Sequence, residues 1–204
     1  MKRKSLLFAL LVALFMPWAA QAQEELTVHD ETGTNSYVPI YGFYADSYLK
    51  CEMVYPAAEL ENMTGGTITS MTFYATSPAT EAWTGTWQVS VTEVDNATIS
   101  AFAGPGTVVY EGALDGTQST MEITFSSPYT YNGGNLLVCV YETSTGNYKS
   151  ITWAGETVNG ASVQGYSYSS LDAVTASQRN FLPKTTSHTF RAAATIALNL
   201  PMLL

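Results

Sequence analysis

The sequence predicts an all-β fold, an antiparallel two-sheet β-sandwich of jelly-roll-like type with about ten short strands. Short segments alternate apolar and polar residues with period two, which is the pattern of half-buried strands. Glycine, proline and asparagine separate these segments, and no long stretch shows the periodicity of a helix. Two packed sheets are the simplest way to bury so many apolar side chains.

The strand predictions rest on two kinds of segment. Residues 136–141 are apolar throughout, which predicts a central strand covered on both faces. Trp87 is in phase with the apolar residues of its own segment, so we expect it in the core. The clearest alternation runs through residues 49–55, 87–92, 121–126 and 150–153.

Turn residues mark where these strands begin and end. Residues 65–66, 104–106 and 132–135 are rich in glycine and precede predicted strands. The turn Thr145-Gly146-Asn147 predicts a hairpin that joins residues 136–142 to residues 148–154. Residues 56–62 begin with proline and predict a single helical turn.

Residues 1–22 have the organisation of a secretory signal peptide. Lys2-Arg3-Lys4 is followed by an apolar run and then by the cleavage pattern Ala20-Gln21-Ala22. A membrane anchor is the alternative, but the run is too short for a bilayer of ~30 Å and Pro17 interrupts it. No later segment approaches the length of a membrane span. We therefore expect a protein that is secreted or held at the cell surface, with its sandwich domain in residues 23–190.

The composition changes at the C-terminal end. Residues 191–204 contain no acidic residue and are rich in alanine and leucine. One interpretation is a last strand that packs on the sandwich. The abrupt change favours another, in which a truncated or frame-shifted end replaces a linker into further domains.

The charge balance excludes two classes of partner. The chain has eight basic and 17 acidic residues, and three of the eight basic residues lie in the leader, which leaves five. Binding to nucleic acid requires a surface of Lys and Arg that neutralises phosphates. Docking on anionic lipid requires the same kind of surface. We expect neither partner.

The cysteines and acidic residues give no strong metal motif. Cys51 and Cys139 lie in strand-like segments, where an oxidising compartment permits a disulfide between them and a free cysteine behaves as a small hydrophobe. Two cysteines and two distant histidines are too few for a zinc-type site, so we expect no cofactor. A structural calcium ion at Asp30, Glu31 and Asp46 is chemically feasible, although no loop has densely spaced ligands.

No catalytic constellation is evident. His29 and His188 lie near opposite ends of the exported chain and outside any nucleophile motif, so we expect two incidental surface histidines. A glycan-active enzyme with paired carboxylates is an alternative, because Glu93, Glu142 and Glu156 lie at or near predicted strand ends. Solvated charges explain these positions more simply, and we expect no enzymatic activity.

Aromatic residues are the richest chemical resource, with 13 Tyr, 8 Phe and 4 Trp. Exposed Trp and Tyr rings stack on sugar rings, while neighbouring polar groups donate hydrogen bonds. The candidate ligand-binding residues are Trp83 in a polar loop, Tyr148 beside a turn, and Tyr166 and Tyr168 in a Gly-Tyr-Ser-Tyr-Ser-Ser segment. The alternative for each is a half-buried side chain of the sandwich.

Several stretches are distinctive in combination. They are residues 34–42, 54–60, 66–74, 179–184 and, most specific, the sequence Pro-Tyr-Thr-Tyr-Asn-Gly-Gly-Asn-Leu-Leu-Val at 128–138. Together they resemble the β-sandwich module near the N-terminus of large secreted surface proteins of Bacteroidota. The resemblance spans residues 26–190 and implies a module that typically precedes fibronectin type III-like repeats and a C-terminal sorting domain. It defines no catalytic residues.

These observations predict a non-catalytic exported module that acts in cell-surface adhesion or binds an extracellular glycan or protein. A purely structural spacer within a larger surface protein is the alternative. A spacer buries or scatters its aromatic side chains, whereas a binding module gathers several of them on one face.

Overall fold

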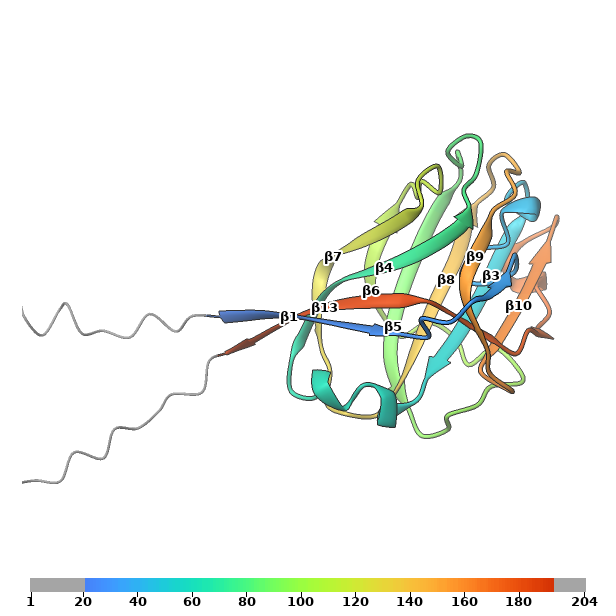
Figure 1. Ribbon diagram of the computed structural model, residues 1–204. Helices are drawn as coiled ribbons and strands as arrows, with labels where there is room; N and C mark the ends of the chain where they lie inside the picture. The colour runs from blue at the N-terminus through green and yellow to red at the C-terminus, as the bar shows by residue number, and fades with distance from the viewer. Residues whose placement is uncertain (1–20, 193–204) are drawn as a thin grey trace, which may run out of the picture.

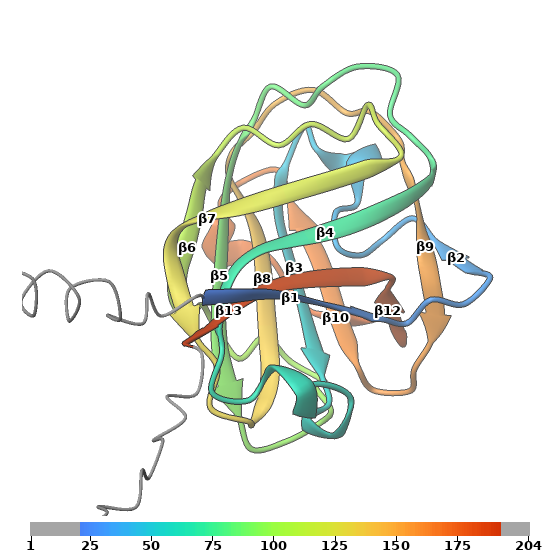
Figure 2. The same ribbon diagram turned by 60° about the vertical axis from the view of Figure 1, so that its left-hand side comes forward.

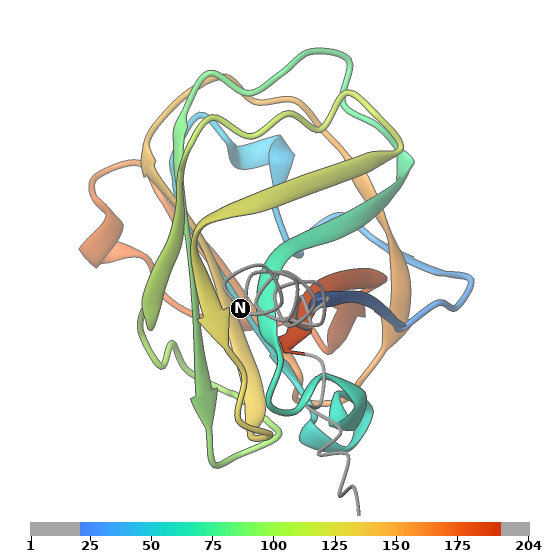
Figure 3. The ribbon, with the colours of Figure 1, turned by 90° about the vertical axis from the view of Figure 1, so that its left-hand side faces the viewer.

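The computed structural model describes residues 21–192 and shows two antiparallel β-sheets, of seven and six strands, packed face to face (Figure 1). Figures 2 and 3 show strands β4 (Thr67–Ser77) and β7 (Thr120–Thr130) of the larger sheet running across β3 (Tyr48–Tyr55) and β8 (Asn135–Ser144) of the smaller one. The predicted all-β sandwich is confirmed, with 13 strands in the described residues rather than about ten.

The smaller sheet has the strand order β11-β10-β3-β8-β5-β6. Most of its inward-facing residues are the apolar members of each alternating segment, and Trp87 is fully buried among them, as predicted. Besides β3 and β8, its strands are β5 (Thr86–Val94), β6 (Thr107–Gly112), β10 (Ser162–Ser167) and β11 (Ser177–Gln178).

The larger sheet has the order β1-β13-β4-β9-β12, with β2 paired to β9 and β7 paired to β4. These strands are β1 (Gln21–Val28), β2 (Gly33–Asn35), β9 (Thr152–Thr157), β12 (Phe181–Pro183) and β13 (Thr185–Ala192).

Helical structure is limited to four short 3-10 helices in the described residues. Two of them, η2 (Ala57–Glu59) and η3 (Glu61–Met63), occupy the segment where the sequence predicts one helical turn. The others are η1 (Gly42–Tyr44) and η4 (Leu171–Ala173). Within residues 21–192, no helix has the length and apolar character needed to cross a membrane.

Strand β8 is buried on both faces, as its apolar sequence predicts. One set of alternate side chains, including Val138, enters the core between the sheets. The other set forms a second cluster on the outer face of the smaller sheet, with Leu137, Cys139 and Tyr141. Ile99 packs on this outer cluster, so the segment that connects β5 to β6 shields it from water.

A buried carboxylate holds that connecting segment in place. Glu52 of β3 is fully buried and accepts hydrogen bonds from the amides of Ala103 at 2.7 Å and Gly104 at 3.1 Å. The hydroxyl of Tyr141 also donates to Glu52. Together these three hydrogen bonds replace the water that burial removes from the carboxyl group.

The structure rules out the disulfide that the sequence permits. Cys51 and Cys139 are both free and buried. Cys51 belongs to the core between the sheets, whereas Cys139 belongs to the outer cluster. In the β3–β8 register Cys51 lies opposite Val140, so the two cysteines are offset by one residue and project from opposite faces of the sheet.

The predicted hairpin between residues 136–142 and 148–154 is wrong. Strand β8 pairs with β3 and β5 in the smaller sheet, whereas β9 pairs with β2, β4 and β12 in the larger one. The turn at Thr145-Gly146-Asn147 is therefore part of a connection that crosses from one sheet to the other.

The predicted leader and tail fall mostly outside the described residues. Residues 1–20 and 193–204 are not described, so neither prediction is tested there. Residues Gln21 and Ala22, the end of the predicted leader, form the start of β1 and pair with Ala192 and Arg191 of β13. The two ends of the described chain thus lie side by side (Figure 1).

We predict that β8 contributes more to stability than the sheet edge does. Replacing Val138, which is fully buried, with Ala removes two methyl groups and leaves a cavity, so the free energy of unfolding should fall by about 2–3 kcal/mol. The same substitution at Val108, which is exposed on β6, should cost less than about 1 kcal/mol. Urea denaturation measures both, and equal losses would contradict this account.

Candidate functional site

Four of the five exposed large hydrophobic residues in the described chain gather in one region. The exposed fractions are 51% for Phe43, 59% for Tyr148, 38% for Tyr166 and 66% for Tyr168. Half-buried Tyr44 connects them, since its ring centroid lies 5.1 Å from that of Phe43 and 6.4 Å from that of Tyr168. The ring centroids of Phe43 and Tyr148 are 6.1 Å apart. We call these five residues the aromatic platform.

The platform is built where η1 meets the end of β10. Tyr44 and Tyr166 stack with ring centroids 3.7 Å apart and an interplanar angle of 15°. Tyr166 is fixed by the pairing of β10 with β3, in which it lies opposite Leu49. The neighbouring Tyr166 hydroxyl, with some desolvation, raises the pKa of Tyr44 to about 12.

The expectation that Trp83 is an exposed ligand-binding residue is wrong. Its side chain is 2% exposed and belongs to the core. The indole Nε1 donates to the carbonyl oxygen of Lys149 at 3.0 Å, and the indole ring lies against Gly42. A Cβ at Gly42 would meet the Lys149 oxygen at 2.2 Å, so η1 approaches this loop closely. Trp83 thus supports, from beneath, the two segments that carry Phe43 and Tyr148.

Two cavities flank the platform. The cavity beside Tyr166 measures about 420 Å³, and the cavity beside Phe43 measures about 210 Å³. The first is lined by polar groups, including Gln164 and Arg179. The second is lined by Ser36, Tyr41, Ser150 and Ile151 in addition to Phe43. One residue of the platform therefore lines each cavity, Phe43 the smaller and Tyr166 the larger.

Arg179 brings a positive charge to the larger of these two cavities. Its guanidinium lies 4.1 Å from the ring centroid of Tyr37, and its Nε and Nη2 donate to Gln164 Oε1 at 3.2 and 2.9 Å. None of the ion pairs among residues 21–192 includes Arg179. The charge is thus held in position without an acidic partner, which suits it to a polar or anionic ligand group.

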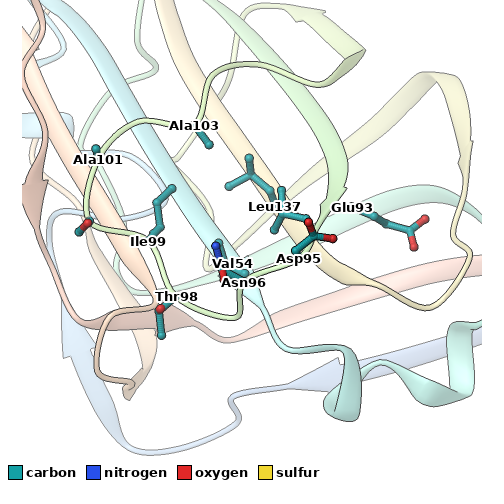
Figure 4. A pocket seen from close by; sticks show the side chains of 11 residues that line it. Val54, Glu93, Asp95, Asn96, Thr98, Ile99, Ala101, Ala103 and Leu137 are labelled. Atoms are coloured by element: carbon teal, nitrogen blue, oxygen red, sulfur yellow. The ribbon is translucent and has the colours of Figure 1, made fainter.

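Another cavity, of about 540 Å³, lies elsewhere (Figure 4). It lies against β3, β5 and β8, where Val54, Ile99 and Leu137 line it. Glu93 is a lining residue, but its carboxylate is directed away from Ile99 and Val54 in Figure 4. The cavity contains no aromatic ring, and its lining is largely aliphatic or exposed loop. It is a weaker candidate than the platform for recognition of a polar ligand.

His29 is not an incidental surface residue, in contrast to the expectation. It is 7% exposed, and its ring nitrogens lie 2.7 Å from Glu156 Oε1 and 2.9 Å from Glu59 Oε2. This places His29 between η2 and β9, where it joins two segments of the sandwich. His188 of β13 is partly exposed and lies 3.2 Å from Glu25. Neither histidine adjoins the aromatic platform in the contacts of the described residues.

The acidic residues at strand ends have separate environments. Glu93 accepts hydrogen bonds from the amides of Asn132 at 2.8 Å and Gly134 at 2.6 Å. Desolvation raises its pKa, but these bonds outweigh that effect and hold the pKa below its ordinary value. Glu156 contacts His29. Glu93 and Glu156 thus serve local contacts of the fold.

Glu142 of β8 is different because it is fully buried and neither carboxylate oxygen has a hydrogen-bond partner. Its pKa is raised to about 9, mainly because burial disfavours the charged form, and the nearby Asp46 carboxylate contributes to this rise. The amide of Gly146 lies close enough to lower this pKa in part, but it donates its hydrogen bond to the carbonyl oxygen of Ala45. The burial of Glu142 also keeps its carboxylate out of reach of a substrate.

The calcium site considered at Asp30, Glu31 and Asp46 is not formed. The described residues contain no group of three or more acidic, His or Cys side chains that could hold a metal ion. Asp30 Oδ1 instead pairs with Lys184 Nζ at 2.6 Å, and Glu31 is exposed.

Sequence reasoning found three members of the platform, Tyr148, Tyr166 and Tyr168, but not Phe43 or Tyr44. The run Tyr41-Gly42-Phe43-Tyr44 is dense in aromatic residues and was the available signal. Nothing local in the sequence indicates that Arg179 lies beside Tyr166, because that contact depends on how β10 and the segment after it pack.

Comparison with protein-family models, with curated proteins and with solved structures finds no match to the chain. The case for a function therefore rests on the geometry of the described residues.

We predict that Glu142 makes stability fall as pH rises. The folded chain keeps the Glu142 proton up to about pH 9, whereas the unfolded chain releases it near the ordinary pKa of 4.5. Between these values the unfolded state binds fewer protons, so rising pH favours unfolding. Glu142→Gln removes this dependence, and the variant should exceed the parent in melting temperature at pH 8.5 by more than at pH 5.

The measurement is thermal unfolding across pH 5 to 9 in buffer with EDTA. Glu122→Gln, an exposed change on β7, is the matched control and should follow the parent. If the difference between Glu142→Gln and the parent does not grow with pH, the raised pKa is wrong.

Proposed function

We propose that the chain is a non-catalytic module that binds glycans on its aromatic platform and acts in adhesion at a cell surface. The observation that supports this most is the gathering of Phe43, Tyr148, Tyr166 and Tyr168 around Tyr44. A structural spacer has no need to expose aromatic rings and can bury or scatter them. Four rings exposed side by side form an apolar patch, and such patches mark binding surfaces.

The chemistry of the platform suits sugars. A pyranose ring presents C–H groups on its faces and hydroxyl groups around its edge. Aromatic rings contact the faces, and fixed polar groups bind the edge. Here the rings lie beside a cavity that contains Gln164 and Arg179. Gln164 is itself fully buried, so it serves to position the Arg179 guanidinium that lines this cavity.

The position of the platform is compatible with a place in a larger surface protein. Figure 1 shows η1 and β10 on the side of the sandwich opposite to the start of β1 and the end of β13. Extension of either end would therefore leave the platform open. Export through the predicted leader, and the resemblance to sandwich modules of Bacteroidota surface proteins, fit the same proposal.

The test is binding to a broad array of glycans, followed by calorimetry with an oligosaccharide that binds. We predict that the double variant Tyr148→Ala/Tyr168→Ala loses affinity by about tenfold or more, since each ring contributes roughly 0.5–1.5 kcal/mol. These two rings are the most exposed of the platform, so the fold should tolerate the change.

Val108→Ala is the control, because Val108 is the one exposed large hydrophobic residue of residues 21–192 outside the platform. It should bind as the parent does. The proposal fails if the parent binds no glycan on the array, which is the result that a structural spacer gives, or if the double variant retains full affinity.

A further inference from the structure

Two carboxylates, Glu142 at the end of β8 and Asp46 after η1, have buried oxygens that lack partners. Both oxygens of Glu142 and the Oδ1 of Asp46 are buried and accept no hydrogen bond from the described residues. Glu142 is 0% exposed. A buried carboxylate without a donor is costly, and most buried polar atoms in proteins are satisfied. By contrast, both carboxylate oxygens of Glu52, on the outer face of the smaller sheet, and of half-buried Glu93 accept hydrogen bonds.

The surroundings of this pair are rich in oxygen and contain no paired cation. None of the ion pairs in residues 21–192 includes Glu142 or Asp46. The position of a Cβ on Gly85 would lie 2.0 Å from Glu142 Oε1 and 2.7 Å from the carbonyl oxygen of Ser144. Glu142 Oε1 and the Ser144 carbonyl oxygen therefore both face the backbone of Gly85, where any side chain would collide with them.

Two neighbouring carboxylates in a buried position repel each other when both are ionised. Asp46 lies near the end of β8, because the carbonyl oxygen of the preceding residue, Ala45, accepts a hydrogen bond from the Gly146 amide at 3.1 Å. The Asp46 charge accordingly contributes to the raised pKa of Glu142. Either a proton or a cation relieves this repulsion. A cation also supplies the partner that all three unbonded oxygens lack, whereas one proton supplies a donor for only one of them.

We propose that Asp46 and Glu142 bind a calcium ion. The available donors are all oxygens, which favours a hard divalent cation, and Ca²⁺ accepts carboxylates, backbone carbonyls and water in a flexible geometry. The Ser144 carbonyl is the nearest backbone candidate for a further ligand. The site has only two acidic side chains, so backbone carbonyls and water supply the other ligands.

Such an ion would join the segment after η1 to the end of β8. Asp46 follows Tyr44 by two residues, and the Asp46 charge also raises the pKa of Tyr168 in the platform, after desolvation. Calcium would therefore stabilise η1 and the segment after it, which carry Phe43 and Tyr44 of the platform. The inference does not depend on the proposed glycan binding, because it concerns the stability of the fold.

The test is thermal unfolding of the full exported chain after treatment with EDTA, with and without 1 mM CaCl₂ at pH 8. If the ion binds with a dissociation constant near 10 µM, the melting temperature should rise by about 5–10 °C. The rise should be lost in Glu142→Gln and in Asp46→Asn and kept in Glu122→Gln. The affinity should weaken at pH 6, because Glu142 must release its proton when the ion binds.

Terbium luminescence is a second readout that does not depend on stability. Trp87 lies opposite Glu142 in the β5–β8 pair, so Tb³⁺ bound at this position should be excited through the indole, and Ca²⁺ should displace it. The inference is overturned if 10 mM CaCl₂ changes neither readout, or if Glu142→Gln and Asp46→Asn respond as the parent does. Loss of glycan binding in the platform variants would leave these results unchanged.

Discussion

The burial of β8 on both faces is the constraint on which the rest of the structure depends. One face requires the seven-stranded sheet as a cover, and this produces the sandwich. The other face carries Leu137 and Tyr141, which water would contact unless the segment between β5 and β6 lay over them. Glu52 holds that segment through hydrogen bonds to two backbone amides. Glu52 thus holds in place the segment that keeps the outer face of the apolar strand β8 away from water.

The aromatic platform and the proposed calcium site both lie where this sheet ends. At the end of β3 and β10, the chain presents Tyr166 and stacks Tyr44 on it. At the end of β8, alternation carries Glu142 to the inner face beside Asp46, where an aliphatic residue would suit the core better. The two features are neighbours because η1 supplies both Tyr44 and the segment that leads to Asp46. Local departures from the sandwich pattern are therefore concentrated in one region.

The sequence is enough to predict where most strands lie, but not which strands pair with one another. Period-two alternation identifies which residues face inward, and it correctly placed Trp87 and the two-sided β8. It could not show that β8 and β9 belong to different sheets, because a turn signal at Gly146 is the same in a hairpin and in a crossing connection. Trp83 was misplaced for a related reason, since polar neighbours in sequence do not reveal that the indole lies beneath η1.

The central claim is that the aromatic platform is the binding surface. The most direct test is a titration of the ¹³C-labelled chain with an oligosaccharide that it binds, followed through the aromatic and methyl resonances in two-dimensional NMR spectra. The account predicts that the Phe43, Tyr148, Tyr166 and Tyr168 signals shift together while those of buried Tyr55 do not. Shifts confined to Ile99 and Leu137, which line the cavity of about 540 Å³ outside the platform, would contradict it.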